Sequence, residues 1–209
     1  HWSGISPALS ASTAAVCREA LEVCKSKRIL VSTDLNYRST LWHWGKSPAE
    51  VMPHLLAFSD IIIGDLNAAS LYLDDEQLHK IASQAKGNIE EQFSLCSTTM
   101  KKHLPSMKML AMSFRGTSGA EVPTYRGALM VDEDCYYSKE YAIPQVIDRI
   151  GSGDAFTGGL LYAAFKGYEP ADAIAFATAA GILKHSMAGD FTILSKAEID
   201  YFIQHGHSS

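Results

Sequence analysis

The sequence lacks every paired-cysteine pattern that would bind zinc or support redox chemistry. Its four cysteines stand at positions 17, 24, 96 and 135, and none forms a C-x-x-C pair. Cys17 and Cys24 are seven residues apart in a stretch that we expect to be helical, where small apolar thiols are common. We therefore expect reduced thiols and a cytoplasmic protein.

Long apolar runs and an excess of positive charge are absent as well. No apolar run approaches the roughly 20 residues that a membrane-spanning helix needs. The chain carries 18 Lys and Arg against 23 Asp and Glu, a formal charge of −5, which argues against a general nucleic-acid-binding protein. With 209 residues, 47% of them hydrophobic, it can form one sizeable globular domain around a core. We expect small-molecule ligands, and neither nucleic acid nor membrane as a partner.

An initial methionine is also missing. The first four residues, His1 to Gly4, have neither the basic start nor the apolar core of a signal peptide. They read as the end of a strand that enters a loop. We therefore expect further sequence upstream, which would make residues 1–209 the C-terminal portion of a single domain.

What the chain does contain is an alternation of strands and helices. Apolar runs predict strands at 28–33, 60–64 and 107–114, with shorter strands between 127 and 147. Helical periodicity covers 8–26, 48–58, a polar stretch to about 104, 154–166, 170–186 and 195–204, the last capped by Ser195 with Glu198. This order predicts an α/β fold with a mostly parallel sheet covered on both faces.

Three polar clusters lie where the predicted strands and loops end, at 34–38, 113–119 and 148–154. In parallel α/β sheets, ligands bind outside the carboxyl ends of the strands. We expect the three clusters to converge on one rim of the sheet.

The strongest local signal is the hexapeptide G-S-G-D-A-F at 151–156. Glycines at a helix N-terminus let backbone N–H groups approach an anion, and the helix dipole adds positive potential there. A carboxylate, Asp154, begins the same helix and could accept the proton of a hydroxyl that receives a phosphoryl group. The alternative is an ordinary capped helix. Neither a Walker A loop nor a dinucleotide G-x-G-x-x-G motif is present at this place.

Residues 148–159, D-R-I-G-S-G-D-A-F-T-G-G, resemble the signature D-x-x-G-A-G-D-x-F of the ribokinase (PfkB) family of carbohydrate kinases, with Ser152 in place of alanine. The resemblance implies a ribokinase-like three-layer α/β/α fold and an ATP-dependent kinase that uses Mg²⁺. It assigns Gly151, Ser152 and Gly153 to the anion hole and Asp154 to the catalytic base, in contact with the substrate.

Residues 34–42, D-L-N-Y-R-S-T-L-W, are similar to the pattern D-x-N-x-R-x-x-L-W of the 2-keto-3-deoxygluconate kinase and fructokinase branches of that family. The resemblance places Asp34 and Asn36 near the ATP phosphates and Arg38 on the sugar acid. The planar fork of Arg38 suits a carboxylate, although a surface ion pair is the alternative.

Further positions follow from the same resemblance. In the keto-deoxygluconate branch, an aspartate at the position of Asp190 binds substrate hydroxyls, whereas Gly189-Asp190 alone would indicate a turn. Weaker matches place six residues near the nucleotide, with a solvated loop as the alternative: Ser113, Arg115, Gly116, Gly119, Lys184 and His185.

The chain departs from the family pattern in two ways. The family's N-x-x-E after the strand at 60–64 is replaced by D-L-N-A at 65–68, so only Asp65 is left there to order a magnesium-bound water. The family's Gly-Gly substrate motif and its lid, through which a homo-oligomer could form, are not found in these 209 residues. We therefore expect residues 1–209 alone to be inactive as a kinase.

The function expected from these residues is transfer of the ATP γ-phosphoryl group to a primary hydroxyl of a sugar acid. The resemblance favours 2-keto-3-deoxygluconate, giving its 6-phosphate, and Asp190 with the basic pair Lys184-His185 supports the acid over a neutral sugar. Two alternatives stay open: a fructokinase-like enzyme, and a non-catalytic module that binds a nucleotide or a sugar.

Overall fold

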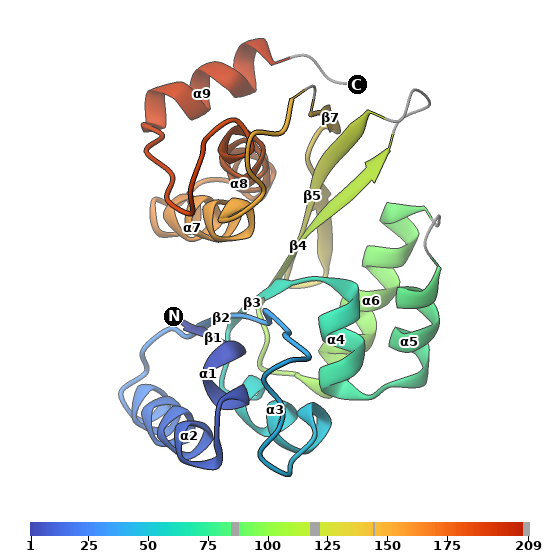
Figure 1. Ribbon diagram of the computed structural model, residues 1–209, viewed down its shortest axis with the longest axis vertical. Helices are drawn as coiled ribbons and strands as arrows, with labels where there is room; N and C mark the ends of the chain where they lie inside the picture. Colours follow the sequence, from blue (N-terminus) through green and yellow to red (C-terminus); the bar gives the residue numbers. More distant parts are fainter. Residues whose placement is uncertain (85–87, 118–121, 144, 207–209) are drawn as a thin grey trace. The chain divides into compact units, whose positions relative to one another are not determined.

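The computed structural model describes residues 1–84, 88–117, 122–143 and 145–206. The chain divides into two compact units (Figure 1). Unit 1 comprises His1–Met112 and Met130–Glu133, and unit 2 comprises Ser113–Leu129 and Asp134–Ser209. Because β4 and β5 contribute residues to both units, the chain passes between the units within strands.

The helices and strands follow one another in the alternation that the sequence predicts. The strands are β1 (Trp2–Ser3), β2 (Ser32–Asp34), β3 (Ile61–Gly64), β4 (Met109–Thr117), β5 (Pro123–Val131), β6 (Asp134–Tyr137) and β7 (Tyr141–Ala142). The helices are α1 (Ile5–Ala8), α2 (Ala11–Ser26), α3 (Pro48–Leu56), α4 (Leu66–Leu73), α5 (Glu76–Ser83), α6 (Ile89–His103), α7 (Ser152–Phe165), α8 (Pro170–Lys184) and α9 (Lys196–His205).

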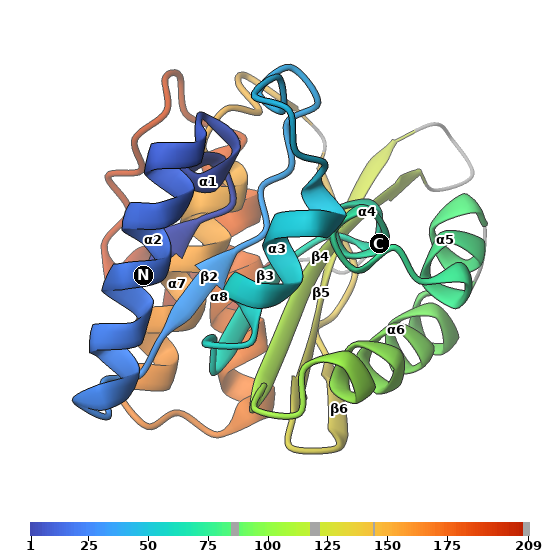
Figure 2. The ribbon, with the colours of Figure 1, turned by 90° about the horizontal axis from the view of Figure 1, so that it is seen from below.

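Unit 1 is built on parallel strands. β1 pairs with β2, β2 with β3 and β3 with β4, all in parallel (Figure 2). The three isoleucines of β3, Ile61 to Ile63, are buried, as is usual for a strand covered on both faces. Helices α4, α5 and α6 lie side by side in both views. These pairings confirm the predicted α/β class with a mostly parallel sheet.

The strand predicted at 28–33 begins later, at Ser32. Arg28 has a φ of 56°, and the Ile29 amide donates to the Cys24 carbonyl, which closes the end of α2. Ile29 and Leu30 are then left half exposed, at 51% and 57%. The apolar run therefore predicted the start of the strand too early. Its first residues close the C-terminal end of α2, although their hydropathy is typical of a strand.

The segment after β2 is held down by a hydroxyl from α4. Asp34 ends β2, and Leu35 follows it as a fully buried residue. The Tyr72 hydroxyl donates a hydrogen bond of 2.8 Å to the Leu35 carbonyl oxygen. A Cβ at Gly4 would lie 2.0 Å from the same oxygen, so the chain approaches this carbonyl closely from two sides. The contact fixes the backbone immediately before the polar cluster at 36–38.

Unit 2 packs helices beside an antiparallel pair of strands. β5 pairs with β7 through Thr124↔Ala142 and Tyr125↔Tyr141. α7 and α8 lie against each other, and α9 packs on α8 (Figure 1). A Cβ at Gly159 would come within 3.0 Å of the Ala180 Cβ, so glycine permits the close approach of α7 and α8. The capping box predicted from Ser195 and Glu198 is present at the start of α9.

Within the described ranges, no helix has both the length and the apolar character that crossing a membrane would require. The division into two compact units does not test the prediction of a single domain, because one domain can contain two compact parts.

Removing the Tyr72 hydroxyl is expected to destabilise unit 1. Tyr72→Phe would leave the buried Leu35 carbonyl without its donor, at a cost of about 1–3 kcal/mol in the free energy of unfolding. The three tryptophans, at positions 2, 42 and 44, all belong to unit 1, so urea unfolding followed by tryptophan fluorescence reports on this unit. Tyr201→Phe, at a side chain that is 65% exposed, is the matched control and should leave the transition unchanged. An unaltered midpoint for Tyr72→Phe would contradict the role of this bond.

Acid is expected to weaken unit 2 through His185. This side chain is 1% exposed, and burial lowers its pKa from the ordinary value of 6.5, even though the ring nitrogen Nδ1 bonds the Gly181 carbonyl at 2.9 Å. The unfolded chain therefore binds the proton more readily than the folded chain does, and stability falls as the pH drops below about 6.5. Urea titrations followed by NMR signals of α8 should show this loss for the natural chain. The loss should be absent in His185→Gln; an identical pH dependence in that variant would assign the effect to other groups.

Candidate active site

The turn before α7 has a backbone that only glycine suits. Gly151 has a φ of 76°, in the left-handed region, and a Cβ there would lie 2.1 Å from the Asp190 carbonyl oxygen. The Ala155 amide donates to the Gly151 carbonyl at 2.8 Å, which begins the helix. The first-turn amides of α7 thus point out of the helix end, where an anion can accept from them.

A carboxylate ties this turn to the loop that carries Asp190. One oxygen of Asp148 accepts the Ile150 amide at 2.9 Å, and the other accepts the Gly189 amide at 3.0 Å. These backbone donors, of Ile150 first and Gly189 second, lower the pKa of Asp148 below its ordinary value. The charged carboxylate is therefore the form that holds the two loops together.

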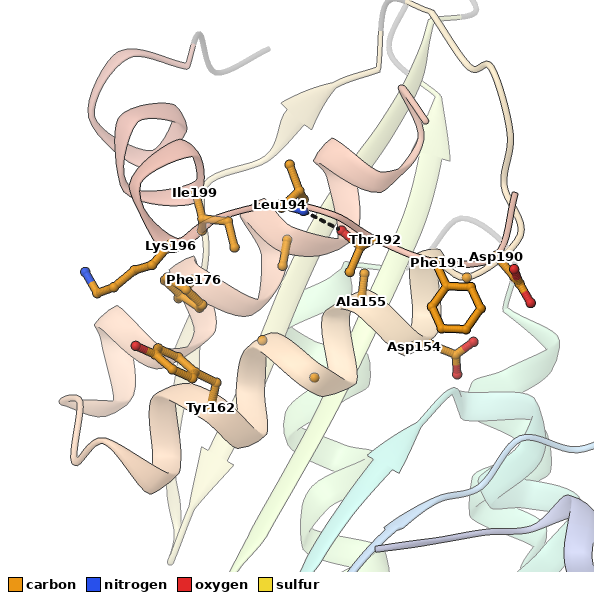
Figure 3. A pocket seen from close by; sticks show the side chains of 14 residues that line it. Asp154, Ala155, Tyr162, Phe176, Asp190, Phe191, Thr192, Leu194, Lys196 and Ile199 are labelled. Atoms are coloured by element: carbon orange, nitrogen blue, oxygen red, sulfur yellow. Dashed lines mark hydrogen bonds between the residues drawn. The ribbon is translucent and has the colours of Figure 1, made fainter. Parts of the chain in front are cut away.

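A pocket of about 510 Å³ extends from this turn along α7 (Figure 3). Its base is made of small residues of α7 and α8, and its sides come from the loop 190–194 and from α9. The residues that line it are Gly151, Asp154, Ala155, Gly158, Gly159, Tyr162, Phe176, Ala180, Asp190, Phe191, Thr192, Leu194, Lys196 and Ile199. All of them belong to unit 2, so the pocket is complete within that unit.

The two carboxylates predicted to meet a substrate share one end of this pocket. Figure 3 shows the side chains of Asp154 and Asp190 there, with the Phe191 ring beside them, whereas Tyr162 and Phe176 lie toward the other end. Both aspartates are exposed. The structure therefore brings together the predicted base, the predicted substrate-binding aspartate and the glycine turn.

Ser152 and Arg115 meet beside the same turn. Ser152 is 1% exposed, and its hydroxyl donates to the Arg149 carbonyl at 3.0 Å. The same oxygen accepts a hydrogen bond of 2.8 Å from a terminal nitrogen of Arg115. The Arg115 guanidinium also lies 5.9 Å from the centre of the buried Tyr125 ring. An arginine predicted near the nucleotide thus reaches the start of α7.

Lys184 and His185 do not form the basic surface patch that the sequence indicated. Their exposures are 0% and 1%, because both side chains turn into the unit at the end of α8. The Lys184 ammonium donates to the Met187 carbonyl at 2.9 Å, and His185 is bonded to Gly181. The support that this patch gave to a sugar acid over a neutral sugar is withdrawn.

The remaining positions of the predicted nucleotide loop lie on β4. Ser113 and Gly116 belong to that strand, and Gly116 is exposed. Gly119 lies outside the described residues. Their contact with a nucleotide stays a prediction.

Unit 1 carries the other predicted site residues at and after the end of β2. One carboxylate oxygen of Asp34 accepts the Asn36 amide at 3.1 Å, and Asn36 takes a left-handed φ of 37°. Arg38 is exposed and donates to the neighbouring Tyr37 carbonyl at 3.0 Å. Across the described part of the chain, no carboxylate forms an ion pair with Arg38.

Asp65 caps a helix. It is exposed at the N-terminus of α4, where one carboxylate oxygen accepts the Ala68 amide at 2.9 Å. Among the residues that the structure describes, no cluster of three His, Cys, Asp or Glu side chains could hold a metal ion.

Two features of the site had no counterpart in the sequence reasoning. The bond from Asp148 to Gly189 joins residues 41 positions apart, and only its local half, to Ile150, follows an Asx-turn pattern. The apolar wall of the pocket, from Tyr162, Phe176 and Phe191, resembles ordinary core sequence and gave no signal.

Comparison with known proteins gives consistent matches. Residues 124–195 match the pfkB family of carbohydrate kinases. The chain is 27% identical over 212 residues to 2-dehydro-3-deoxygalactonokinase of Haloferax volcanii, covering 99% of this chain and 57% of that protein.

Solved structures agree in fold. The crystal structure of 2-dehydro-3-deoxygluconokinase from Thermotoga maritima has a TM-score of 0.83 and 28% identity, covering 97% of this chain and 59% of that one. A PfkB family carbohydrate kinase from Listeria grayi has a TM-score of 0.79 and 26% identity, covering 97% and 58%. The chain thus spans somewhat more than half the length of these relatives, shares their ribokinase-like fold, and matches the pfkB family of carbohydrate kinases over residues 124–195.

Proposed function

We propose that the protein carrying this chain transfers the γ-phosphoryl group of ATP to a hydroxyl of a sugar acid of the 2-keto-3-deoxygluconate type. The observation that carries the proposal is the exposed carboxylate of Asp154 in the unit 2 pocket, in the first turn of α7, where a helix N-terminus can bind an anion. The substrate class is supported by the relatives from Haloferax volcanii and Thermotoga maritima, which are named as kinases of 2-dehydro-3-deoxy sugar acids.

In this mechanism, Asp154 accepts the proton of the acceptor hydroxyl as its oxygen attacks the γ-phosphorus. The bond between that phosphorus and the bridging oxygen of ATP breaks, and ADP leaves with the electron pair. The amides at the start of α7 donate hydrogen bonds to the phosphoryl oxygens as negative charge shifts across them. Gly153 leaves this approach open, because no atom outside its chain neighbours and the nearby backbone of α7 lies within 4 Å of the place that a Cβ would occupy.

ATP brings magnesium to such a reaction, where the ion neutralises charge on the phosphates. Magnesium typically binds one or two carboxylates and retains several waters, so a single exposed aspartate suits it better than a protein cage does. Asp65 meets that description, with one oxygen used in the helix cap and the side chain open to solvent. Asp34, Asn36, Ser113, Arg115 and Gly116 are the residues we assign to the nucleotide.

Recognition of the acid is assigned to Arg38 and Asp190. A guanidinium fork forms paired hydrogen bonds with a carboxylate, and Arg38 is exposed with no ion-pair partner among the described residues. Asp190 can accept hydrogen bonds from sugar hydroxyls at the same end of the pocket as Asp154. Because Gly151 packs on the Asp190 backbone, binding of the sugar and of the phosphoryl group would depend on one shared turn.

Asp154→Asn is expected to abolish turnover while ATP still binds. The amide is nearly isosteric with the carboxylate but cannot accept the proton, and general-base catalysis contributes about 10²–10⁴-fold. Steady-state kinetics with 2-keto-3-deoxygluconate, alongside calorimetry with ATP, separates the two effects. Asp172→Asn is a matched control, because Asp172 is an exposed carboxylate in the first turn of α8, outside the pocket. Near-normal kcat in Asp154→Asn would remove the base from this mechanism.

Arg38→Ala is expected to raise KM for the sugar acid by about 10- to 150-fold, the worth of a charge-assisted hydrogen bond, and to change KM for ATP little. Lysine should rescue only in part, since it lacks the planar fork.

The comparison substrate for this variant is fructose, which has no carboxylate. If the natural protein phosphorylates fructose as well as the acid, and Arg38→Ala loses both activities equally, the protein is a fructokinase-like enzyme and Arg38 does not recognise a carboxylate.

A further inference from the structure

Ser152 is the one position of the 148–156 motif that departs from the family pattern, which has alanine there. Its side chain is almost fully buried, yet it carries a hydroxyl. A buried hydroxyl in place of a methyl group must find hydrogen-bond partners, because leaving it unpaired costs free energy. The hydroxyl finds one donor and one acceptor, the Arg115 guanidinium at 2.8 Å and the Arg149 carbonyl at 3.0 Å.

Arg115 is held from two directions. The bond to Ser152 fixes one terminal nitrogen, and the Tyr125 ring lies 5.9 Å from the guanidinium carbon, within the range of a cation–π contact. The ring is itself fixed, since Tyr125 is fully buried and makes T-shaped ring contacts with Phe156 and His185. A long and otherwise exposed side chain is thereby restricted to one place, at the first turn of α7.

We infer that Ser152 is a positioning residue that places the Arg115 guanidinium beside the anion-binding turn, where Arg115 binds the phosphates of the nucleotide. This inference rests on the proposed function. The guanidinium has five N–H donors, and the contact with Ser152 uses one of them, so the others can meet phosphate oxygens. The Ser152 hydroxyl does not touch the nucleotide in this arrangement and acts through Arg115 alone.

The electrostatic reason is that α7 offers an anion only partial charges. The helix end is equivalent to roughly half a positive charge, whereas nucleotide phosphates carry several negative charges. A guanidinium held at the same turn adds a full positive charge without the rotamer entropy that a free arginine loses on binding. With alanine at position 152, the arginine would keep only its contact with the Tyr125 ring, and the nucleotide would have to complete its ordering.

The test is a double-mutant cycle on the protein carrying this chain, with Kd for ATP and for AMP measured by calorimetry. Arg115→Ala should weaken ATP binding about 10-fold or more, and Ser152→Ala about 5-fold, the worth of one ordinary hydrogen bond. Both effects should be smaller for AMP, which has fewer phosphates, and should shrink at high salt.

The decisive result is the double variant. If Ser152 acts through Arg115, adding Ser152→Ala to Arg115→Ala changes Kd no further. A purely structural role in the turn, through the bond to Arg149, would give the full loss in both backgrounds and would overturn the inference. Folding is not a concern for Ser152→Ala, because alanine is the residue of the family pattern.

Lys166→Ala serves as the charge control. It removes one positive charge at the opposite end of α7, about 20 Å along the helix, and should leave Kd for ATP unchanged. If the natural protein neither binds ATP nor phosphorylates the sugar acid, the proposed function and this inference both fail. If it does both and the cycle is additive, only the inference fails.

Discussion

The contact between Gly151 and the Asp190 carbonyl is the constraint on which the candidate site depends. A left-handed residue with no side chain lets the loop 189–194 lie directly on the turn that starts α7. The Asp148 carboxylate then bonds an amide on each side of that contact. Two segments about 40 residues apart are thus held together by the Asp148 carboxylate and by the close backbone approach at Gly151. These contacts bring Asp154 and Asp190 to the same end of the pocket without a direct bond between their own side chains.

The sequence was sufficient for most of the fold, because hydrophobic periodicity and caps are local. Three local features were predicted correctly: the capping box of Ser195 and Glu198, the helix that starts at Pro170, and the buried isoleucines of β3. The strand at 28–33 was misplaced because the left-handed Arg28 belongs to a helix ending that hydropathy does not register. The candidate site was predicted from the motif at 151–154, and the roles of these residues stay a prediction. The link from Asp148 to Gly189 was not, since nothing in either segment signals the other.

Lys184 and His185 show why charge in a sequence is an uncertain guide to surface potential. Lys184 is the last residue of α8 and His185 is its C-cap, where a basic side chain can bond nearby backbone carbonyls instead of facing water. Lys184 bonds the Met187 carbonyl just beyond the helix, and His185 bonds the Gly181 carbonyl in its last turn. Arg115, by contrast, came from a weaker match and proved to reach the turn. The difference lies in what each side chain bonds: Arg115 lies on β4, two residues before its end, and donates to the Ser152 hydroxyl at the start of α7.

Gly151 and Gly153 are two residues apart, and glycine is required at the two positions for different reasons. Position 151 admits glycine alone for reasons of backbone conformation and space, so any replacement damages the turn itself. Position 153 has a free volume around its missing Cβ and a negative φ that any residue can adopt, so the fold would tolerate a side chain there. A chain of this lineage that had lost its phosphoryl-transfer role could therefore drift at 153 while keeping glycine at 151. The pair distinguishes, within three residues, a requirement of folding from a requirement of chemistry.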